Sequence, residues 1–254
     1  MSRFPGRRAR YDAAALVQID PATTGPTALW AGTITTGATF TWSDLSGNGN
    51  DLVQSTVGAQ PTKNNSSATF NGQPSISFAG AHGLGTAGNV SLGTTFEFVF
   101  VVNITGAATT RIVWETSTVG AGSTVGSILI GYNWTAPAGS GYSLLIHGSV
   151  GNNWQAVNAP SGPSVVAVAG DLTASPDGQD FRYDNVKQTV VSNAGLADNS
   201  AALVALPLFL GSRAGTGGVA PITGEFAFAA LWTRARSEAE RASVNAFLRS
   251  KYGV

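Results

Sequence analysis

The chain has 254 residues, of which 11% are charged and 43% are hydrophobic, and it contains 32 glycines and no cysteine. This length suffices for one large domain with its own core, and the scarcity of Lys and Glu beside abundant Thr, Ser, Asn, Gly and Val disfavours a helical bundle. A formal net charge of zero excludes a long-range attraction of the whole molecule to nucleic acid or anionic lipid, and the lack of cysteine excludes disulfides and thiolate sites.

The N-terminal region lacks the pattern of a membrane or secretory segment. No apolar run approaches the ~20 residues that a membrane helix needs. The apolar run at residues 11–18 is too short for a signal peptide and is followed by Asp20-Pro21, so we predict no secretory signal and no membrane partner.

Residues 1–30 are predicted to form an N-terminal arm, because proline and glycine interrupt regular structure there and four arginines crowd its start. One interpretation is a free, solvated tail. The other is a docking arm that attaches the protein to a neighbouring virion or surface subunit in a multi-copy assembly or homo-oligomer, with arginines contacting carboxylates and aromatic residues as anchors. Nucleic-acid binding is disfavoured, since no basic or aromatic pattern continues into the domain. The predicted docking residues are Arg3, Phe4, Arg7, Arg8, Arg10 and Tyr11.

Strand patterns begin near residue 30. Residues 39–42 and 73–79 alternate with period two, and the clearest strand is 95–102. In that strand one face carries three phenylalanines and the other carries Val99 and Val101, so we expect both faces to be covered.

Further strands follow down to the C-terminal region. Asp184-Asn185 suits a two-residue hairpin turn between two of them, because both residue types tolerate left-handed backbone angles. Around ten strands with short connections predict an all-β, antiparallel sandwich or barrel. The additional strands are predicted at 110–115, 126–132, 142–147, 163–170, 179–184, 186–191, 205–211 and 224–232.

One helix is predicted at 237–252. Ser237 and Glu240 have the spacing of a capping box, and Gly253 stands at the position where a glycine ends a helix. Between them an apolar stripe recurs at helical spacing and should pack on the sandwich. The stripe consists of Val244, Phe247 and Leu248.

Three stretches resemble the concanavalin-A-like, laminin-G-like jelly-roll family. Residues 42–52 (WSDLSGNGNDL) resemble the opening "W-x-D-x-SGNGND" motif, and residues 71–78 (NGQPSISF) are similar to the strand that follows it. Residues 224–254 look like the closing strand and helix. The resemblance implies a jelly-roll domain over 31–254. Phe228 departs from it, since relatives carry a glutamate there.

The resembling loop places oxygen-bearing side chains at alternating positions, as calcium ligands require. Counting from Asp44, the twelfth position is Ser55 rather than the glutamate of an EF-hand. The alternative is a tight turn held by Asx hydrogen bonds. No other cofactor is expected, and the candidate Ca²⁺ ligands are Asp44, Ser46, Asn48 and Asn50.

Two glycine-flanked stretches that end in tryptophan, 131–134 and 151–154, are the candidate glycan contacts. Sugar rings stack on aromatic faces, and asparagine amides offer both a donor and an acceptor to hydroxyls. The alternative is that one or both tryptophans fill the core, as we expect for Trp42 and Trp232. The candidate carbohydrate-binding residues are Tyr132, Asn133, Trp134, Asn152, Asn153 and Trp154.

Catalysis is not predicted. The "E-x-D-x-x-E" strand motif of glucanase relatives is absent, although Glu97 and Glu115 could approach each other across strands. We therefore predict a non-enzymatic virion decoration or appendage protein on the virion surface, whose jelly roll binds glycans. The alternatives are a bacterial extracellular carbohydrate-binding or adhesion module and a polysaccharide-cleaving enzyme.

Overall fold

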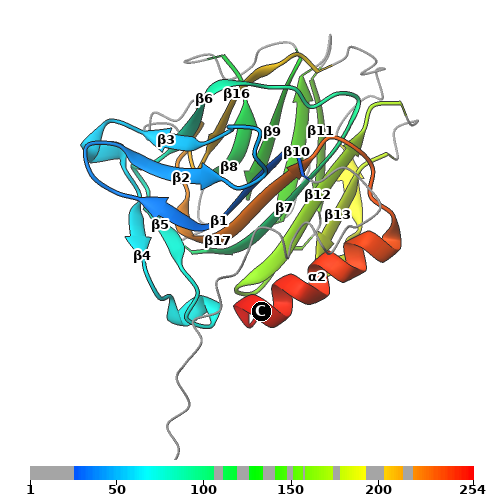
Figure 1. Ribbon diagram of the computed structural model, residues 1–254. Coiled ribbons are helices and arrows are strands. Elements are labelled where there is room, and N and C mark those ends of the chain that lie inside the picture. Colours follow the sequence, from blue (N-terminus) through cyan, green and yellow to red (C-terminus); the bar gives the residue numbers. More distant parts are fainter. Residues whose placement is uncertain are drawn as a thin grey trace, which may run out of the picture.

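The computed structural model describes residues 26–105, 111–118, 126–133, 141–147, 151–156, 158–173, 178–192, 203–213 and 220–254. Over these ranges the chain forms an antiparallel β-sandwich with a C-terminal helix, as predicted (Figure 1).

We call the first layer sheet A. Its central strands are β17 and β7, which pair with each other. On its other side, β17 pairs with β5 along its first half and with β1 along its second half. The strands of sheet A, in spatial order, are β4 (Thr62–Asn64), β5 (Ser75–Ala79), β1 (Ala28–Thr35), β17 (Thr223–Trp232), β7 (Thr95–Ile104), β12 (Ser164–Asp171), β13 (Asp180–Tyr183) and β14 (Val186–Lys187).

The second layer, sheet B, is connected to sheet A at both edges. At one edge β2 (Phe40–Asp44) pairs with both β1 and β3, and at the other β14 is followed closely along the chain by β15. The strands of sheet B, in spatial order, are β3 (Leu52–Gln54), β6 (Leu84–Val90), β16 (Leu206–Leu210), β8 (Arg111–Thr116), β9 (Ser127–Tyr132), β10 (Tyr142–His147), β11 (Gly151–Ala156) and β15 (Val190–Ser192).

The main core lies between the sheets and is rich in aromatic rings. Phe98 of β7 contacts Trp114 of β8 with ring centroids 4.9 Å apart, and Trp30 lies 5.3 Å from the same Trp114. Trp42 is also fully buried in this core, which confirms its predicted place.

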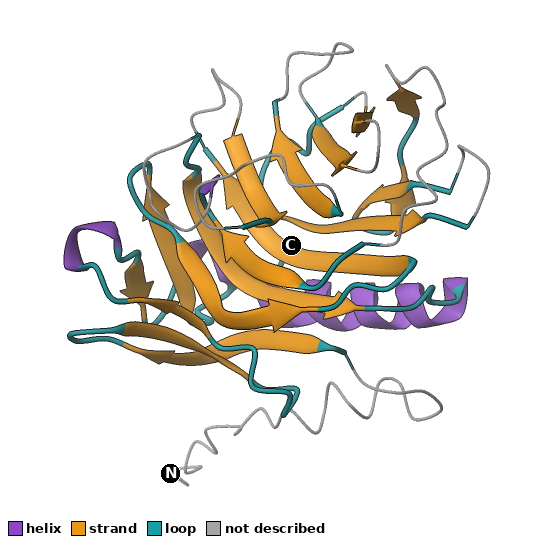
Figure 2. Ribbon diagram, turned by 90° about the horizontal axis from the view of Figure 1, so that it is seen from above, coloured by secondary structure: helices purple, strands orange, loops and turns teal. Residues whose placement is uncertain are grey.

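A second apolar cluster covers the outer face of sheet A. Val99 and Val101 of β7 point into it, as the two-faced pattern of residues 95–102 predicts, and so does the buried Trp232. Helix α2 (Glu238–Tyr252) packs its Val244 and Leu248 on this face, and Figure 2 shows it lying along the outside of one layer.

Both ends of α2 are capped as predicted. The Ser237 hydroxyl accepts from the Glu240 backbone N–H, and the Glu240 carboxylate accepts from the backbone N–H of Ser237. Gly253 ends the helix with a φ of 71°, in the left-handed region that glycine adopts without strain.

Several boundaries differ from the sequence-based expectation. β1 begins at Ala28, before the predicted arm boundary at residue 30, and the predicted strand 186–191 is divided into β14 and β15. The turn at Asp184-Asn185 is present, with φ values of 50° and 68°. Short 3₁₀ turns, η1 (Val57–Ala59) and η2 (Ala68–Phe70), interrupt the early strands.

Candidate functional site

The Asp44 carboxylate organises the loop that was considered for calcium. Its Oδ1 accepts from the backbone N–H groups of Leu29 and Ser46, each at 2.9 Å. Its Oδ2 accepts from the Ser46 hydroxyl and the Asn50 backbone N–H, also at 2.9 Å. Both oxygens are therefore engaged with protein donors, since each offers about two lone-pair sites.

The asparagines of this loop also have protein partners. The amide groups of Asn48 and Asn50 donate to the Thr27 carbonyl at 2.9 and 3.0 Å. These bonds account for the tight turn as an Asx-type structure. Within the described ranges no three His, Cys, Asp or Glu side chains come together as a metal site would require, and calcium binding stays the untested alternative to the hydrogen-bonded turn.

The first predicted glycan stretch lies at the end of β9. Tyr132 is 6% exposed and packs edge-on against Tyr142, with ring centroids 5.1 Å apart, and burial raises the pKa of its hydroxyl. Tyr132 is thus a core residue, which corrects its assignment to the glycan surface. Asn133 is half-buried, with a φ of 56°, and its N–H donates to the Gly141 carbonyl. Trp134 lies outside the described residues.

The second stretch is part of β11, not of a loop. Asn152, Asn153 and Trp154 pair with residues 144–146 in the middle of β10, and Asn153 stands opposite Leu145. Their side chains lie outside the described part of the structure. Both predicted stretches nevertheless belong to the same sheet, two strands apart, on either side of β10.

The outer face of sheet B carries polar residues that were not among the predicted glycan contacts. Glu115, Leu129 and Leu145 stand opposite one another on β8, β9 and β10, and residues opposite each other in a ladder share a face. Glu115 and Leu129 are each 1% exposed, yet neither belongs to the core between the sheets. They therefore mark the face that points away from sheet A.

Glu115 is paired with a residue far away in sequence. The Arg213 Nε lies 3.5 Å from Glu115 Oε1, and the side chain of Arg213 is 27% exposed. Nearby on β10, Ser143 is 1% exposed and its hydroxyl has no hydrogen-bond partner. An unmatched buried hydroxyl is uncommon, so its presence on this face needs an explanation.

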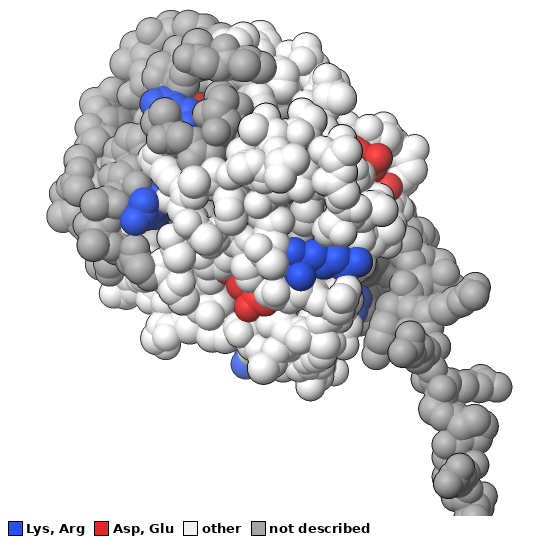
Figure 3. Space-filling model, turned by 90° about the vertical axis from the view of Figure 1, so that its left-hand side faces the viewer, with Lys and Arg blue, Asp and Glu red and all other residues white. Residues whose placement is uncertain are grey.

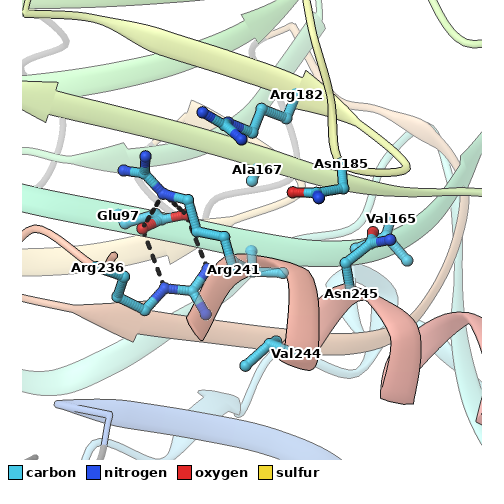
Figure 4. Close-up of a pocket in the computed structure, with 10 residues that line it drawn as sticks. Glu97, Val165, Ala167, Arg182, Asn185, Arg236, Arg241, Val244 and Asn245 are labelled. Carbon is cyan, nitrogen blue, oxygen red and sulfur yellow. Dashed lines mark hydrogen bonds and ion pairs between the residues drawn. The ribbon is translucent and has the colours of Figure 1, made fainter. Parts of the chain in front are cut away.

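A third polar group lies between α2 and sheet A (Figure 4). The Glu97 carboxylate accepts from Arg236 at 2.7 and 3.0 Å and from Arg241 at 3.2 and 3.3 Å, and both Glu97 and Arg236 are almost fully buried. The Arg236 guanidinium also stacks over the Trp232 ring at 4.1 Å. The adjoining cavity of about 10 Å³ accommodates roughly one water molecule.

The network continues to β13. Arg182 is bound by Asp180 and by Glu238 of α2, with shortest distances of 2.8 and 2.7 Å, and Arg241 reaches both of these carboxylates. The hydrogen bond to Asp180 raises the pKa of Arg182, and Arg182 lowers the pKa of Glu238. The positive charges of three arginines thus balance the negative charges of three carboxylates, and their ion pairs fix α2 to sheet A. We call this cluster the ionic clasp; its members are Arg182, Arg236, Arg241, Glu97, Asp180 and Glu238.

The two buried glutamates, Glu97 and Glu115, lie on opposite outer faces of the sandwich. Glu97 stands opposite Trp232 on the outer face of sheet A, while Glu115 is on the outer face of sheet B. Packed sheets lie ~10 Å apart, so the two carboxylates do not approach each other. The expectation that they could meet across strands is wrong.

Charged side chains elsewhere are scattered. Figure 3 views the molecule from the side of β2 and β4, and the lysines, arginines and acids of the described residues form small separate patches on that face rather than one charged surface. None of the helices in the described ranges has the length and apolarity of a membrane span.

No family model and no curated protein matches the sequence. Among solved structures, Trypanosoma rangeli sialidase is 12% identical with a TM-score of 0.57, over 90% of this chain and 33% of that one. A heptameric SAP-like pentraxin from Limulus polyphemus is 11% identical with a TM-score of 0.52, over 67% of this chain and 81% of the pentraxin.

The carbohydrate-binding module CBM40 of a Ruminococcus gnavus sialidase, also solved with sialyllactose, is 11% identical with a TM-score of 0.44, over 64% of this chain and 96% of the module. This chain spans about a third of the trypanosomal sialidase. At these identities the comparisons establish the architecture: the chain has a lectin-like, jelly-roll β-sandwich fold.

Proposed function

We propose that this protein is a non-enzymatic glycan-binding module whose ligand lies on the outer face of sheet B. The observation that carries this proposal is the difference between the two outer faces. On sheet A, α2 covers the outer face, packs on its apolar residues and pairs its buried charges, whereas the outer face of sheet B has no helix over it in the described residues and carries an acid, an arginine and an unpartnered hydroxyl.

The chemistry of this face suits sugar hydroxyls. A sugar hydroxyl both donates and accepts, so it can bond to the guanidinium of Arg213, which is 27% exposed. Ser143 and Glu115 are 1% exposed, so a ligand reaches them only when the groups that cover them move aside. Leu145 is half-buried beside them and supplies apolar contact to the C–H face of a ring. Stacking on Trp134 and Trp154 remains our prediction from the sequence.

The absence of catalysis is part of the proposal. Glycosidases place two carboxyl groups about 5–9.5 Å apart across one groove. Glu97 and Glu115 lie on opposite outer faces, and each is held by arginine. Neither is therefore positioned as one member of an acid–base pair with the other.

Ser143→Ala tests the binding face. Because the Ser143 hydroxyl has no protein partner, its removal should leave the melting temperature unchanged or slightly raised. If the hydroxyl contacts a glycan, calorimetry or a glycan array should show an affinity loss of about 3- to 10-fold. Ser164→Ala, in β12 of sheet A, is the matched control and should bind normally. Unchanged glycan binding by the Ser143 variant would contradict this placement of the ligand.

We further propose that the module is displayed on a virion surface, attached through residues 1–30, with an extracellular adhesion module as the alternative. The supporting observation is the cluster of arginines and aromatic residues before the domain. Deleting residues 1–12 should leave the melting temperature nearly unchanged and abolish attachment to the particle or partner subunit. A deletion variant that still copurifies with its partner would refute the docking role.

A further inference from the structure

We infer that Asn48 is a site of spontaneous deamidation in the folded protein, and that the fold protects the second Asn-Gly pair of the chain. An asparagine side chain reacts most readily when glycine follows it, because glycine has no Cβ to shield its backbone nitrogen. The chain contains two such pairs, Asn48-Gly49 and Asn71-Gly72. The two pairs differ in how the fold holds the attacking nitrogen.

The reaction uses only the atoms of the pair and one water molecule. The Gly49 nitrogen loses its proton and attacks Cγ of Asn48, so that a C–N bond forms while the bond from Cγ to Nδ2 breaks and the amide nitrogen leaves as ammonia. Water then opens the cyclic imide at either of its carbonyls, which gives aspartate or isoaspartate at position 48. The access of the glycine nitrogen to the side chain therefore decides the rate.

The first pair is accessible in the loop that joins β2 to β3. Asn48 and Gly49 are both exposed, and the Gly49 nitrogen donates to no acceptor in the described part of the chain. No heavy atom beyond the neighbouring residues lies within 4 Å of the place that a Cβ on Gly49 would take. The Asn48 amide donates to the Thr27 carbonyl and to the Ser46 hydroxyl, but these bonds are exposed and open readily to water.

The second pair is held at the end of η2. The Gly72 N–H donates to the Ser67 carbonyl at 2.8 Å, and Asn71 is the C-cap residue of η2, with a φ of 50°. The Asn71 amide also donates to the Lys251 carbonyl at the end of α2, at 3.4 Å. Asn71 and Gly72 are exposed too, so the bond to Ser67 rather than exposure distinguishes the pairs. Attack by the Gly72 nitrogen first requires that this bond break.

Deamidation weakens the loop in which Asn48 lies. The amide donates at 2.9 Å to the carbonyl of Thr27, whereas a carboxylate at the same place only accepts. The new negative charge would lie beside the Ser46 hydroxyl, which donates to the Asp44 carboxylate at 2.9 Å, so that two like charges stand one hydroxyl apart. Asn48→Asp should therefore lower the melting temperature by about 2–4 °C. An unchanged melting temperature would refute this consequence.

Peptide mapping compares the two pairs within one molecule. No lysine or arginine lies between Arg10 and Lys63 or between Lys63 and Arg111, so trypsin releases peptides 11–63 and 64–111 with one Asn-Gly pair each. The native protein is aged at mildly alkaline pH, and mass spectrometry follows the replacement of NH by O, with fragment ions assigning the residue. We expect Asn48 to convert at least ~10-fold faster than Asn71, a factor that one hydrogen bond on the nitrogen supplies.

Two controls show whether the fold causes the difference. In urea both pairs lose their native contacts and should convert at similar rates. Asn48→Ser removes the reacting amide, so peptide 11–63 of that variant should show no conversion in the native state. Equal native conversion at Asn48 and Asn71, or conversion of peptide 11–63 that persists in the Asn48→Ser variant, would overturn the inference. Conversion of Asn48 in urea but not in the native protein would overturn it as well.

Discussion

Replacing Glu97 by glutamine should destabilise the protein strongly, because it removes the carboxylate that neutralises a buried arginine. The side chains of Arg236 and Glu97 are 2% and 1% exposed, and the carboxylate accepts from both Arg236 and Arg241. Breaking a buried ion pair by removing one partner typically costs about 3–5 kcal/mol. For a domain of this size that corresponds to a fall in melting temperature of about 6–20 °C.

The matched control is Glu240→Gln, which breaks the more exposed pair with Arg234 while keeping a capping side chain at the same helix position. Its cost should stay below about 1 kcal/mol. Urea denaturation followed by tryptophan fluorescence measures both variants. Replacing Glu97 and Arg236 together by methionine should recover most of the loss, since no unpaired charge then remains buried. If Glu97→Gln is no more destabilising than Glu240→Gln, the clasp does not hold α2.

Three further predictions concern other parts of the fold. Gly211→Ala should cost about 2–4 kcal/mol by urea denaturation, because φ there is 87° and an added Cβ would meet the Phe78 ring at 2.3 Å; Gly58→Ala, with open space around it, should be nearly neutral. Asp44→Asn should cost about 1–3 kcal/mol, and calcium or EDTA should leave the melting temperature of the unaltered protein unchanged; a clear rise with calcium would show that a cation displaces the loop's hydrogen bonds. The hydrogen bond from Arg234 lowers the pKa of Glu240 from 4.5 to about 2, so its stabilising effect is complete above pH 4.5 and is lost as the pH falls toward 2. Acid melting curves of Glu240→Gln should accordingly fall less steeply over that range than those of the unaltered protein.

The regular elements with strong local patterns were predictable from the sequence. The strand at 95–102 and the capped helix at 237–252 combine side-chain periodicity with clear end signals, and both are present. No strand was predicted at β1, β3, β4 or β6. β3 and β4 have three residues each, and β6, with sequence LGTAGNV, lacks alternation. β11 was taken for a polar stretch, and it is a strand because β10 and β15 pair with it.

The polar clusters could not be predicted, because they join residues that are distant along the chain. Glu115 and Arg213 are 98 positions apart, and Glu97 and Arg236 are 139 positions apart. Nothing in the local sequence around either glutamate distinguishes a buried, paired acid from a solvated strand residue. Their faces follow only from strand register and from the position of α2.

The central claim is that ligand binds to the outer face of sheet B. The most direct test is a methyl and amide NMR titration with the tightest-binding glycan of an array. We predict shift changes at Ser143, Leu145 and Leu129, with Val101 and Leu248 under α2 unaffected. Changes confined to α2 and the outer face of sheet A would contradict the account.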